Sequence, residues 1–312
     1  QYKLAKLLSD NLPKKLNTSY FTNSGTEAIE GAIKLSKRAT GKQEIISFKG
    51  SYHGSTQGSL SLMGNEEYKS NYRPLIPNCH QILYNNRKSL EKISNNTAAV
   101  IIEPIQGATG FITPEDNFLK EVRNKCDETG TLLIFDEIQT CFGRLGKLFG
   151  LEYYNVMPDI LCIAKGMGGG MPIGAFISSW ELMNLLTFKP KLGHITTFGG
   201  HPVSCAAALA TLQQLLSTPI MREVSKKEKL FRKNLKHPKI KEIRGKGLML
   251  SIELKNKEVA QNLVNRALEK KLILFYFLFT ETAIRITPAL NITDEDIIKG
   301  CNIIKEILDK TK

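Results

Sequence analysis

The chain has 312 residues, of which 42% are hydrophobic and 23% are charged, which is ordinary for a globular protein. Its net charge of +13 comes from scattered lysines, not from a basic stripe with interleaved aromatics, so the composition argues against a nucleic-acid binder. No run of about 18 apolar residues occurs, so we expect no transmembrane helix and no membrane partner.

The first 15 residues predict an amphipathic helix and not a signal peptide. From there to about residue 217, short apolar runs alternate with helical segments. The expected buried strands are residues 45–48, 98–102, 131–135, 160–163 and 173–177, and the helices between them include residues 26–38, 114–129 and 202–216. This alternation predicts an α/β fold, a mostly parallel sheet with helices on both faces and ligands at the carboxyl ends of the strands.

The pattern changes at about residue 218, after which we expect a small α+β unit. It should contain a lysine-rich connector, strands at 247–254, 272–279 and 283–286, a helix at 257–270, and a last helix at 293–309 that begins after the N-cap Thr293. We therefore predict a large domain at residues 1–217 and a small C-terminal domain at residues 218–312.

The six cysteines include no close pair, and several sit in apolar segments. They indicate reduced thiols and a cytoplasmic protein. The five histidines show no metal-ligand spacing, so we expect no metal site.

Asp136, Lys165 and Glu103 each follow an apolar run directly, which places them at the carboxyl ends of the expected strands. A lysine amine can form a Schiff base with an aldehyde, and a carboxylate can keep a pyridine nitrogen protonated, which are the two requirements of pyridoxal phosphate. A surface lysine before a turn is the more common explanation of such a residue. Here the apolar run 160–164 is expected to bury Lys165, and a buried lysine is costly unless it has a function.

Three other segments carry weaker signals. Gly25 and Thr26 open a helix whose free N–H groups and hydroxyl can bind an anion, although an ordinary helix cap is the more common case. Tyr52 follows a strand and can cover one face of a cofactor ring, although core aromatics are more common at such positions. Thr197 lies in a second turn of hydroxyl and glycine residues ahead of a helix.

Taken together and in this order, five motifs resemble those of class III aminotransferases, the fold-type-I pyridoxal-phosphate enzymes that include acetylornithine, ornithine, 4-aminobutyrate and ω-amino-acid transaminases. The motifs are Asn-Ser-Gly-Thr-Glu-Ala (23–28), Tyr-His-Gly (52–54), Glu-Pro-Ile-Gln-Gly (103–107), Asp-Glu-Ile-Gln-Thr (136–140) and Ala-Lys-Gly-Met-Gly-Gly-Gly (164–170). The resemblance extends over the whole chain. It implies pyridoxal phosphate as cofactor and transfer of an amino group from an amino acid or ω-amine to a 2-oxo acid, such as 2-oxoglutarate or pyruvate, by a ping-pong mechanism.

The resemblance also implies roles for the residues around the cofactor ring. Lys165 is expected to hold the cofactor as a Schiff base and to move the proton of the substrate. Asp136 is expected to pair with the ring nitrogen, Gln139 to hydrogen-bond the phenolic oxygen, and Tyr52 to stack on the ring. His53, in the same motif as Tyr52, is counted among the cofactor-binding residues.

Further roles concern the phosphate and the substrate. Gly25 and Thr26 are expected to hold the phosphate, and Thr197 to reach the phosphate of a neighbouring subunit, which implies a homodimer with shared active sites. Glu103 is expected to line the pocket near the ring. Arg285 matches the arginine that binds the substrate carboxylate, and its apolar neighbours argue against a surface strand residue.

Two positions depart from the pattern of the ornithine, acetylornithine and 4-aminobutyrate branches. Ser55 stands where those branches usually carry an arginine, and Ala108 stands where they carry a glutamate. Both departures favour ω-amino acids or amines, whereas residues 193–197 resemble the acetylornithine branch, so the amino donor stays open. Family members usually carry several dozen further residues before the position of Gln1, so we expect that an N-terminal family segment is absent from this sequence.

Two alternatives to an aminotransferase remain open from the sequence. The first is a racemase, aminomutase or decarboxylase, because the residues around the ring serve all of these reactions. The second is a catalytically silent binding protein that kept the fold, against which the presence of Lys165, Asp136 and Gln139 argues.

Overall fold

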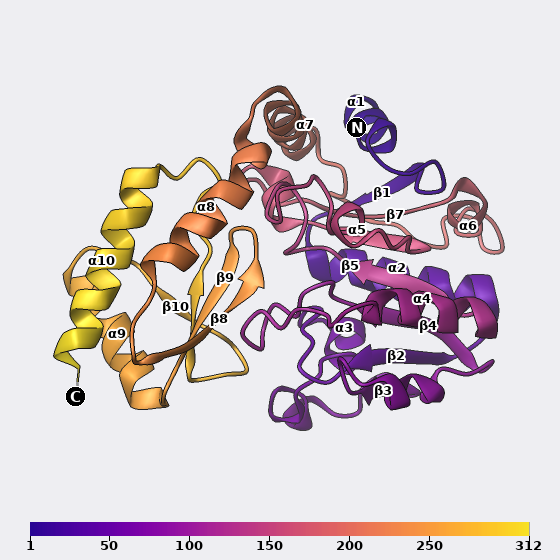
Figure 1. The fold of residues 1–312 in the computed structure, drawn as a ribbon. Helices are drawn as coiled ribbons and strands as arrows, with labels where there is room; N and C mark the ends of the chain where they lie inside the picture. The colour runs from indigo at the N-terminus through magenta and orange to yellow at the C-terminus, as the bar shows by residue number, and fades with distance from the viewer. Residues whose placement is uncertain (312) are drawn as a thin grey trace.

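Two β-sheets organise the protein in the computed structural model, which describes residues 1–311 (Figure 1). The larger sheet has seven strands, which in spatial order are β1 (Thr18–Thr22), β7 (Gly174–Ser178), β6 (Ile160–Ile163), β5 (Leu132–Asp136), β4 (Thr97–Ile102), β2 (Glu44–Phe48) and β3 (Cys79–Ile82). Neighbouring strands from β6 to β3 are parallel, whereas β7 runs antiparallel to both β1 and β6. The predicted α/β fold with a mostly parallel sheet is confirmed.

Helices cover both faces of this sheet, and the strand side chains alternate between two cores. Ile134 packs on the side of α2 (Gly25–Thr40), whereas Leu133 and Phe135 pack on the other side. The helices of the second side are α1 (Tyr2–Asp10), α4 (Phe118–Thr129), α5 (Gly150–Tyr154) and α7 (Pro202–Ser217). Strands buried on both faces need continuous apolar runs, which explains why these strands could be recognised in the sequence.

The packing of α2 against the sheet depends on one glycine. A Cβ atom at Gly31 would lie 2.3 Å from Cε1 of Phe176 in β7. A larger residue would therefore push the helix away from the sheet, and the N-terminus of the same helix forms part of the site described below.

The smaller sheet has four antiparallel strands in the order β10 (Phe275–Tyr276), β11 (Ala283–Ile286), β9 (Met249–Leu254) and β8 (Ile240–Lys246). It packs with α8 (Ile220–Asn234), α9 (Lys257–Glu269) and α10 (Asp294–Lys310) around its own core, the orange and yellow part of Figure 1. Thr293 caps α10 as predicted, because its hydroxyl accepts a hydrogen bond of 3.1 Å from the Asp296 N–H. This core begins at Val224, while the division at residue 217 stays a prediction.

Short helices complete the chain. They are α3 (Gln57–Ser61), α6 (Trp180–Asn184) and the 3₁₀ segments Glu66–Tyr68, Ser70–Tyr72, Arg87–Lys92 and Lys165–Gly168. Within residues 1–311, no single helix has the length and apolar character of a membrane span. The pair α7 and α8 would have both only if counted as one helix, but the two helices meet at an angle of 71°.

Polar and aromatic contacts join the two sheets. The Arg144 guanidinium donates hydrogen bonds to the carbonyls of Leu248 (3.1 Å) and Pro288 (2.7 Å). The rings of Phe111 and Phe277 meet edge to face with centroids 4.7 Å apart, inside a shared apolar cluster. Because Phe277 lies just ahead of β11, these contacts place β11 against the loop that follows β4.

Most predicted elements are confirmed, and the exceptions are edge or short strands. The sequence did not reveal β1 and β3, which lie at the two edges of the large sheet and are only partly buried. β8 occupies the expected lysine-rich connector, because its exposed face carries the charges. The predicted strand 272–279 was wrong: only Phe275–Tyr276 pairs with β11, and the chain then turns to bury Phe277.

Candidate active site

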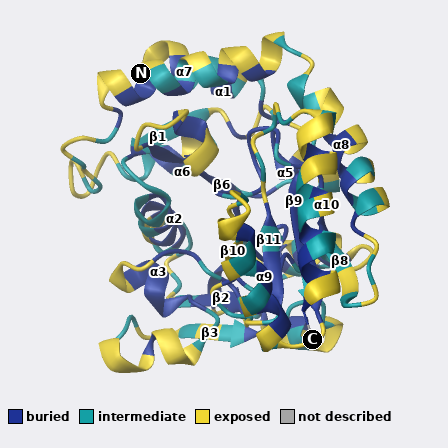
Figure 2. Cartoon of the chain, turned by 90° about the vertical axis from the view of Figure 1, so that its left-hand side faces the viewer, coloured by how far each residue is buried: buried dark blue, intermediate teal, exposed yellow. Residues whose placement is uncertain are grey.

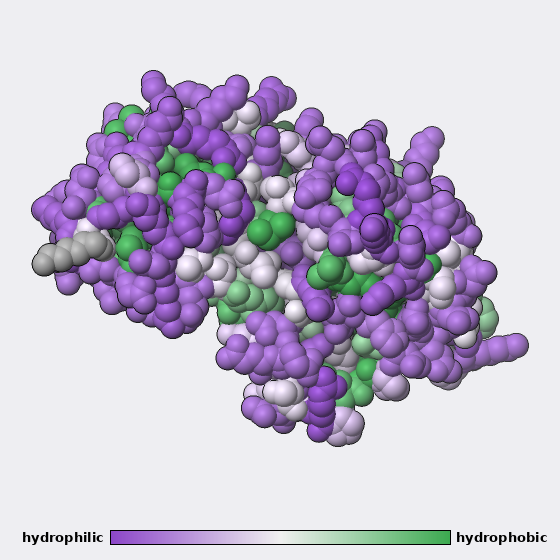
Figure 3. Space-filling model, turned by 60° about the horizontal axis from the view of Figure 1, so that its bottom comes forward, coloured by the Kyte–Doolittle hydropathy of each residue, from purple (hydrophilic) through white to green (hydrophobic). Residues whose placement is uncertain are grey.

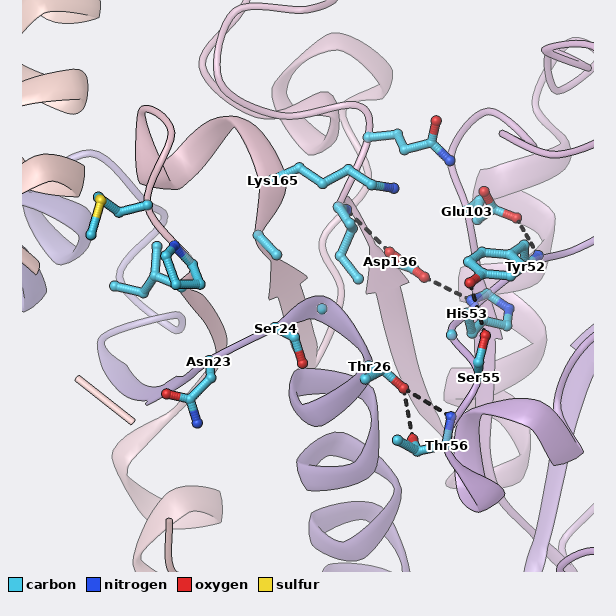
Figure 4. A pocket seen from close by; sticks show the side chains of 18 residues that line it. Asn23, Ser24, Thr26, Tyr52, His53, Ser55, Thr56, Glu103, Asp136 and Lys165 are labelled. Atoms are coloured by element: carbon cyan, nitrogen blue, oxygen red, sulfur yellow. Dashed lines mark hydrogen bonds and ion pairs between the residues drawn. The ribbon is translucent and has the colours of Figure 1, made fainter. Parts of the chain in front are cut away.

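A cavity of about 500 Å³ opens at the carboxyl ends of β5 and β6 (Figure 4). All the predicted site residues line this cavity except Arg285 and Thr197. Its complete lining is Asn23, Ser24, Gly25, Thr26, Tyr52, His53, Gly54, Ser55, Thr56, Glu103, Asp136, Ile138, Gln139, Ala164, Lys165, Met171, Pro172 and Ile173. The motifs found along the sequence are thus brought together at one place by the parallel sheet.

Asp136 is the last residue of β5, and its carboxylate is fixed from two sides. Oδ2 lies 2.7 Å from Nδ1 of His53, and Oδ1 accepts a hydrogen bond of 3.1 Å from the Ile138 N–H. Both Asp136 and His53 are buried, and Nε2 of His53 has no hydrogen-bond partner within residues 1–311. The imidazole therefore fixes the orientation of the carboxylate, which lines the cavity.

Lys165 follows β6 with a left-handed backbone (φ 48°) and begins a 3₁₀ turn. We expected the preceding apolar run to bury this side chain, and that was wrong: the run is buried, but the lysine extends into the open cavity beside Asp136 (Figure 4). Surrounding protein still replaces much of the water around the amine, which lowers the pKa of Lys165, while the carboxylates of Asp136 and Glu103 oppose this effect. The amine is thus more readily neutral, and therefore nucleophilic, than an ordinary lysine.

Glu103 and Tyr52 form the opposite wall. The carboxylate of Glu103 accepts hydrogen bonds from the N–H groups of Tyr52 (3.0 Å) and Gly107 (2.8 Å). Burial is the main cause that raises the pKa of Glu103 to about 7, and the nearby Asp136 carboxylate adds to it. The Tyr52 hydroxyl lies 3.1 Å from the Ser55 hydroxyl. Tyr52 is thus held at its backbone N–H by Glu103 and at its hydroxyl by Ser55.

The first turn of α2 forms the floor of the cavity. Gly25 and Thr26 are its first two residues, and N–H groups at such positions have no partner inside the helix. The Thr26 hydroxyl joins a cluster of hydroxyls, 2.6 Å from Thr56 Oγ1 and 2.7 Å from Ser59 Oγ. A Cβ atom at Gly25 would lie 2.7 Å from Cδ1 of Ile138, so glycine lets Ile138 approach the helix end. A long helix presents positive charge here, which suits an anion.

Arg285 lines a second cavity of about 430 Å³ that shares Tyr52, Gln139 and Lys165 with the first. Its guanidinium lies over the rings of Phe277 (4.8 Å) and Phe111 (5.7 Å) and donates a hydrogen bond of 3.3 Å to the Gly107 carbonyl. Its Nε is buried and has no hydrogen-bond partner within residues 1–311. The arginine is therefore positioned by its aromatic neighbours and keeps donors for a ligand.

Thr197 is exposed and lines neither of these two cavities. Three lining residues lie outside the motifs and elements expected from the sequence, namely Thr56, Met171 and Pro172. A signal for the second cavity is present there: the aromatic run at residues 275–279 stands shortly before Arg285, and four of its members line the cavity. Within residues 1–311, no group of three His, Cys, Asp or Glu side chains could hold a metal ion.

Residues 1–308 match the family of class III aminotransferases. The chain belongs to this family. A class III aminotransferase depends on pyridoxal phosphate and passes an amino group from a donor to a 2-oxo acid, so these statements hold for this chain as well. The alternatives of a racemase, aminomutase or decarboxylase, or of a silent binding protein, are not favoured.

Three similar proteins illustrate the breadth of the family. The acetylornithine aminotransferase of Methanopyrus kandleri is 42% identical over 264 residues, which are 84% of this chain and 67% of the relative. The putrescine aminotransferase of Pectobacterium atrosepticum is 38% identical over 324 residues, with 98% of this chain and 69% of the relative covered. A structure of the ornithine aminotransferase of Toxoplasma gondii, with partial occupancy of pyridoxal phosphate, superimposes with a TM-score of 0.91 at 28% identity and covers 98% of this chain and 75% of its own.

The first cavity of this aminotransferase fits pyridoxal phosphate. Three chemically different groups are required, and all three are present: the amine of Lys165, the carboxylate of Asp136 and the N-terminus of α2 for a phosphate. Between them the walls are the aromatic Tyr52 and the aliphatic Ile138, which suit the two faces of a planar ring.

Proposed function

We propose that this aminotransferase holds its cofactor with Lys165, Asp136 and the first turn of α2, and holds the carboxylate of its substrate with Arg285. One observation carries the proposal. Lys165 lines both cavities, so its amine stands between the groups that suit the cofactor and the arginine that suits a carboxylate. A substrate anchored at Arg285 would present its amine toward Lys165.

Each residue then has a defined task. The bound cofactor supplies an electron sink that stabilises negative charge on the substrate carbon. Asp136, oriented by His53, keeps a proton on the ring nitrogen. The Nζ atom of Lys165 takes the proton from the substrate Cα and returns it on the cofactor side, and its lowered pKa favours this role.

The remaining residues bind and orient. We assign to Gln139 a hydrogen bond to the phenolic oxygen and to Tyr52 the stacking contact with the ring. Gly25 holds the phosphate through its backbone N–H, and Thr26 holds it through its backbone N–H and its hydroxyl. The hydroxyls of Thr56 and Ser59 fix the position of the Thr26 hydroxyl. Glu103 fixes the backbone of Tyr52 and thereby the position of the stacked ring.

Peptide mapping after borohydride reduction tests this assignment. The holoenzyme should carry a pyridoxyl group on Lys165, and the Lys165→Ala variant should carry none there. Lys147 is the matched control, since it lines neither cavity described above. A label on Lys147 or on any lysine other than Lys165 would show that the assignment is wrong.

Arg285 is the only arginine among the described residues that line the two cavities. Ser55 and Ala108 line these walls in place of an arginine and a glutamate. A missing charged hydrogen bond costs about 1.5–3 kcal/mol, a factor of roughly ten to a hundred in affinity. We therefore propose that donors needing one carboxylate anchor or none react better than acetylornithine or 4-aminobutyrate. The measurement is kcat/KM for each donor with pyruvate and with 2-oxoglutarate.

We further propose a homodimer in which Thr197 completes the site of the partner subunit. Two features support this: Thr197 is exposed outside the cavities of its own chain, and the apolar side chains Leu192, Ile195 and Phe198 beside it are 66–75% exposed. Large apolar side chains grouped on a surface favour a protein interface. A cytoplasmic location is likewise a proposal, supported by six cysteines without disulfides.

A further inference from the structure

We propose that Phe275 and Leu278 form an apolar subsite that selects amino donors whose end remote from the reacting amine is aliphatic or aromatic. The inference rests on the proposed function, because it takes Lys165 as the reacting group. It goes further by assigning a substrate class to a wall of the second cavity that the catalytic residues leave unexplained.

Phe275 lies beside Arg285 by strand register. β10 pairs antiparallel with β11, and Phe275 is directly opposite Arg285, so the two side chains share one face of the sheet. Tyr276 also lines the cavity, but by register its side chain belongs to the other face, and its hydroxyl donates a hydrogen bond of 3.5 Å to the Gln261 carbonyl on α9. The ring of Phe275 thus extends the surface that Phe277 and Arg285 begin.

Phe275 is 65% exposed and Leu278 is 41% exposed, although both line the cavity that contains Lys165. Figure 2 shows β10 in the exposed colour beside β11, and Figure 3 shows a hollow between the two parts of the molecule with apolar groups inside it. Apolar side chains that face a ligand cavity gain free energy when a ligand removes water from them.

The turn after β10 is fastened to segments that connect strands of the large sheet, so this wall has a fixed place. The Tyr68 hydroxyl donates a hydrogen bond of 3.1 Å to the Leu278 carbonyl, and its ring lies 5.2 Å from that of Phe279. The Phe279 N–H donates to the Ala108 carbonyl at 3.0 Å. A fixed wall discriminates between ligands better than a mobile one.

The charges of the cavity point to the same class of donor. Its charged lining residues are Lys165, which is the reacting amine, and Arg285, and no carboxylate is among the described residues that line it. The second ammonium of a diamine would meet the like charge of Arg285 without a counter-ion on these walls, whereas an alkyl or phenyl end meets Phe275, Leu278 and Ala108.

The test compares pentylamine with putrescine, which has the same length but an ammonium in place of the terminal methyl group. With the holoenzyme and pyruvate as acceptor, kcat/KM for pentylamine should exceed that for putrescine at least about tenfold. Phe275→Ser should reduce this ratio about tenfold, whereas Phe275→Leu, which keeps an apolar side chain, should retain most of it. Ile273→Ser is the matched control, because Ile273 is 68% exposed and does not line the cavity.

The outcomes separate the subsite from the proposed function. If putrescine reacts as well as pentylamine, or if Phe275→Ser leaves the ratio unchanged while the variant melts like the wild type, the subsite is refuted. In both cases the amino transfer itself and the pyridoxyl label on Lys165 would stand. If the holoenzyme transfers no amino group from any donor and Lys165 carries no label, the proposed function fails and the subsite fails with it.

Discussion

Removing the imidazole of His53 should weaken the site without changing any group that lies against the substrate carbon. The Nδ1 atom of His53 lies 2.7 Å from Oδ2 of Asp136, and both side chains are buried. His53→Phe keeps a ring of similar size but leaves the carboxylate with the Ile138 N–H as its remaining hydrogen bond. We expect Asp136 to lose its orientation toward the cofactor.

The size of the effect follows from the geometry. A hydrogen bond to a charged group contributes about 1.5–3 kcal/mol, which corresponds to a loss of roughly ten- to a hundredfold in rate or in cofactor affinity. The assays are kcat/KM for one donor at saturating cofactor and the dissociation constant of pyridoxal phosphate. His53→Asn places an amide N–H near the position of Nδ1 and should recover part of the loss.

His80 provides the control for this substitution. It is exposed and lies 3.7 Å from Glu44 at the edge of the large sheet, so His80→Phe should leave both quantities unchanged. If His53→Phe retains kcat/KM and cofactor affinity within about twofold, a difference smaller than an ordinary hydrogen bond provides, the positioning role of His53 is wrong.

Three further predictions concern a catalytic carboxylate, a buried acid and the assembly. Asp136→Asn should bind cofactor but lose about a hundredfold or more in kcat, and turnover within a few-fold of the wild type would contradict the electron-sink role. Burial raises the pKa of Glu137 from 4.5 to about 7, so the folded state holds a proton that the unfolded chain releases near pH 4.5. The unfolding free energy should therefore decrease by about 3 kcal/mol as the pH rises from 4.5 to above 7. Denaturant titrations at pH 5 and pH 8 should show a decrease that is smaller in Glu137→Gln than in the wild type by most of this amount, because Glu103, whose pKa is also raised to about 7, contributes equally to both proteins. Sedimentation should show a dimer, and Thr197→Ala should lower cofactor affinity; a fully active monomer would exclude the shared site.

The large sheet and most of the first cavity could be predicted because they depend on local patterns. Strands buried on both faces must be apolar throughout, and polar side chains that follow such strands gather at one edge. This is why the apolar runs alone predict that Asp136, Lys165 and Glu103 lie at the carboxyl ends of strands. Motif order then identified Gly25 and Tyr52, whose own signals were weak.

The remaining features depend on contacts between distant residues, which no local pattern encodes. His53 and Asp136 are 83 residues apart, and their hydrogen bond exists only because β2 and β5 end at the same edge of the sheet. The exposure of Lys165 was mispredicted because burial was inferred from its neighbours in sequence, whereas the cavity is formed by other elements. The two-residue strand β10 is set by its pairing with β11 and by the burial of Phe277.

Asp136 and Glu137 show why composition alone does not assign function to buried acids. They are adjacent and both buried, yet only Asp136 faces the cavity. The Glu137 carboxylate turns away and accepts the N–H groups of Gly150 and Leu151 at the start of α5. Its raised pKa reflects burial, which these two N–H groups only partly offset, whereas the Asp136 carboxylate, held by His53, lines the cavity. Of two neighbouring carboxylates, the one whose protein contacts leave the cavity side free is the one available for chemistry.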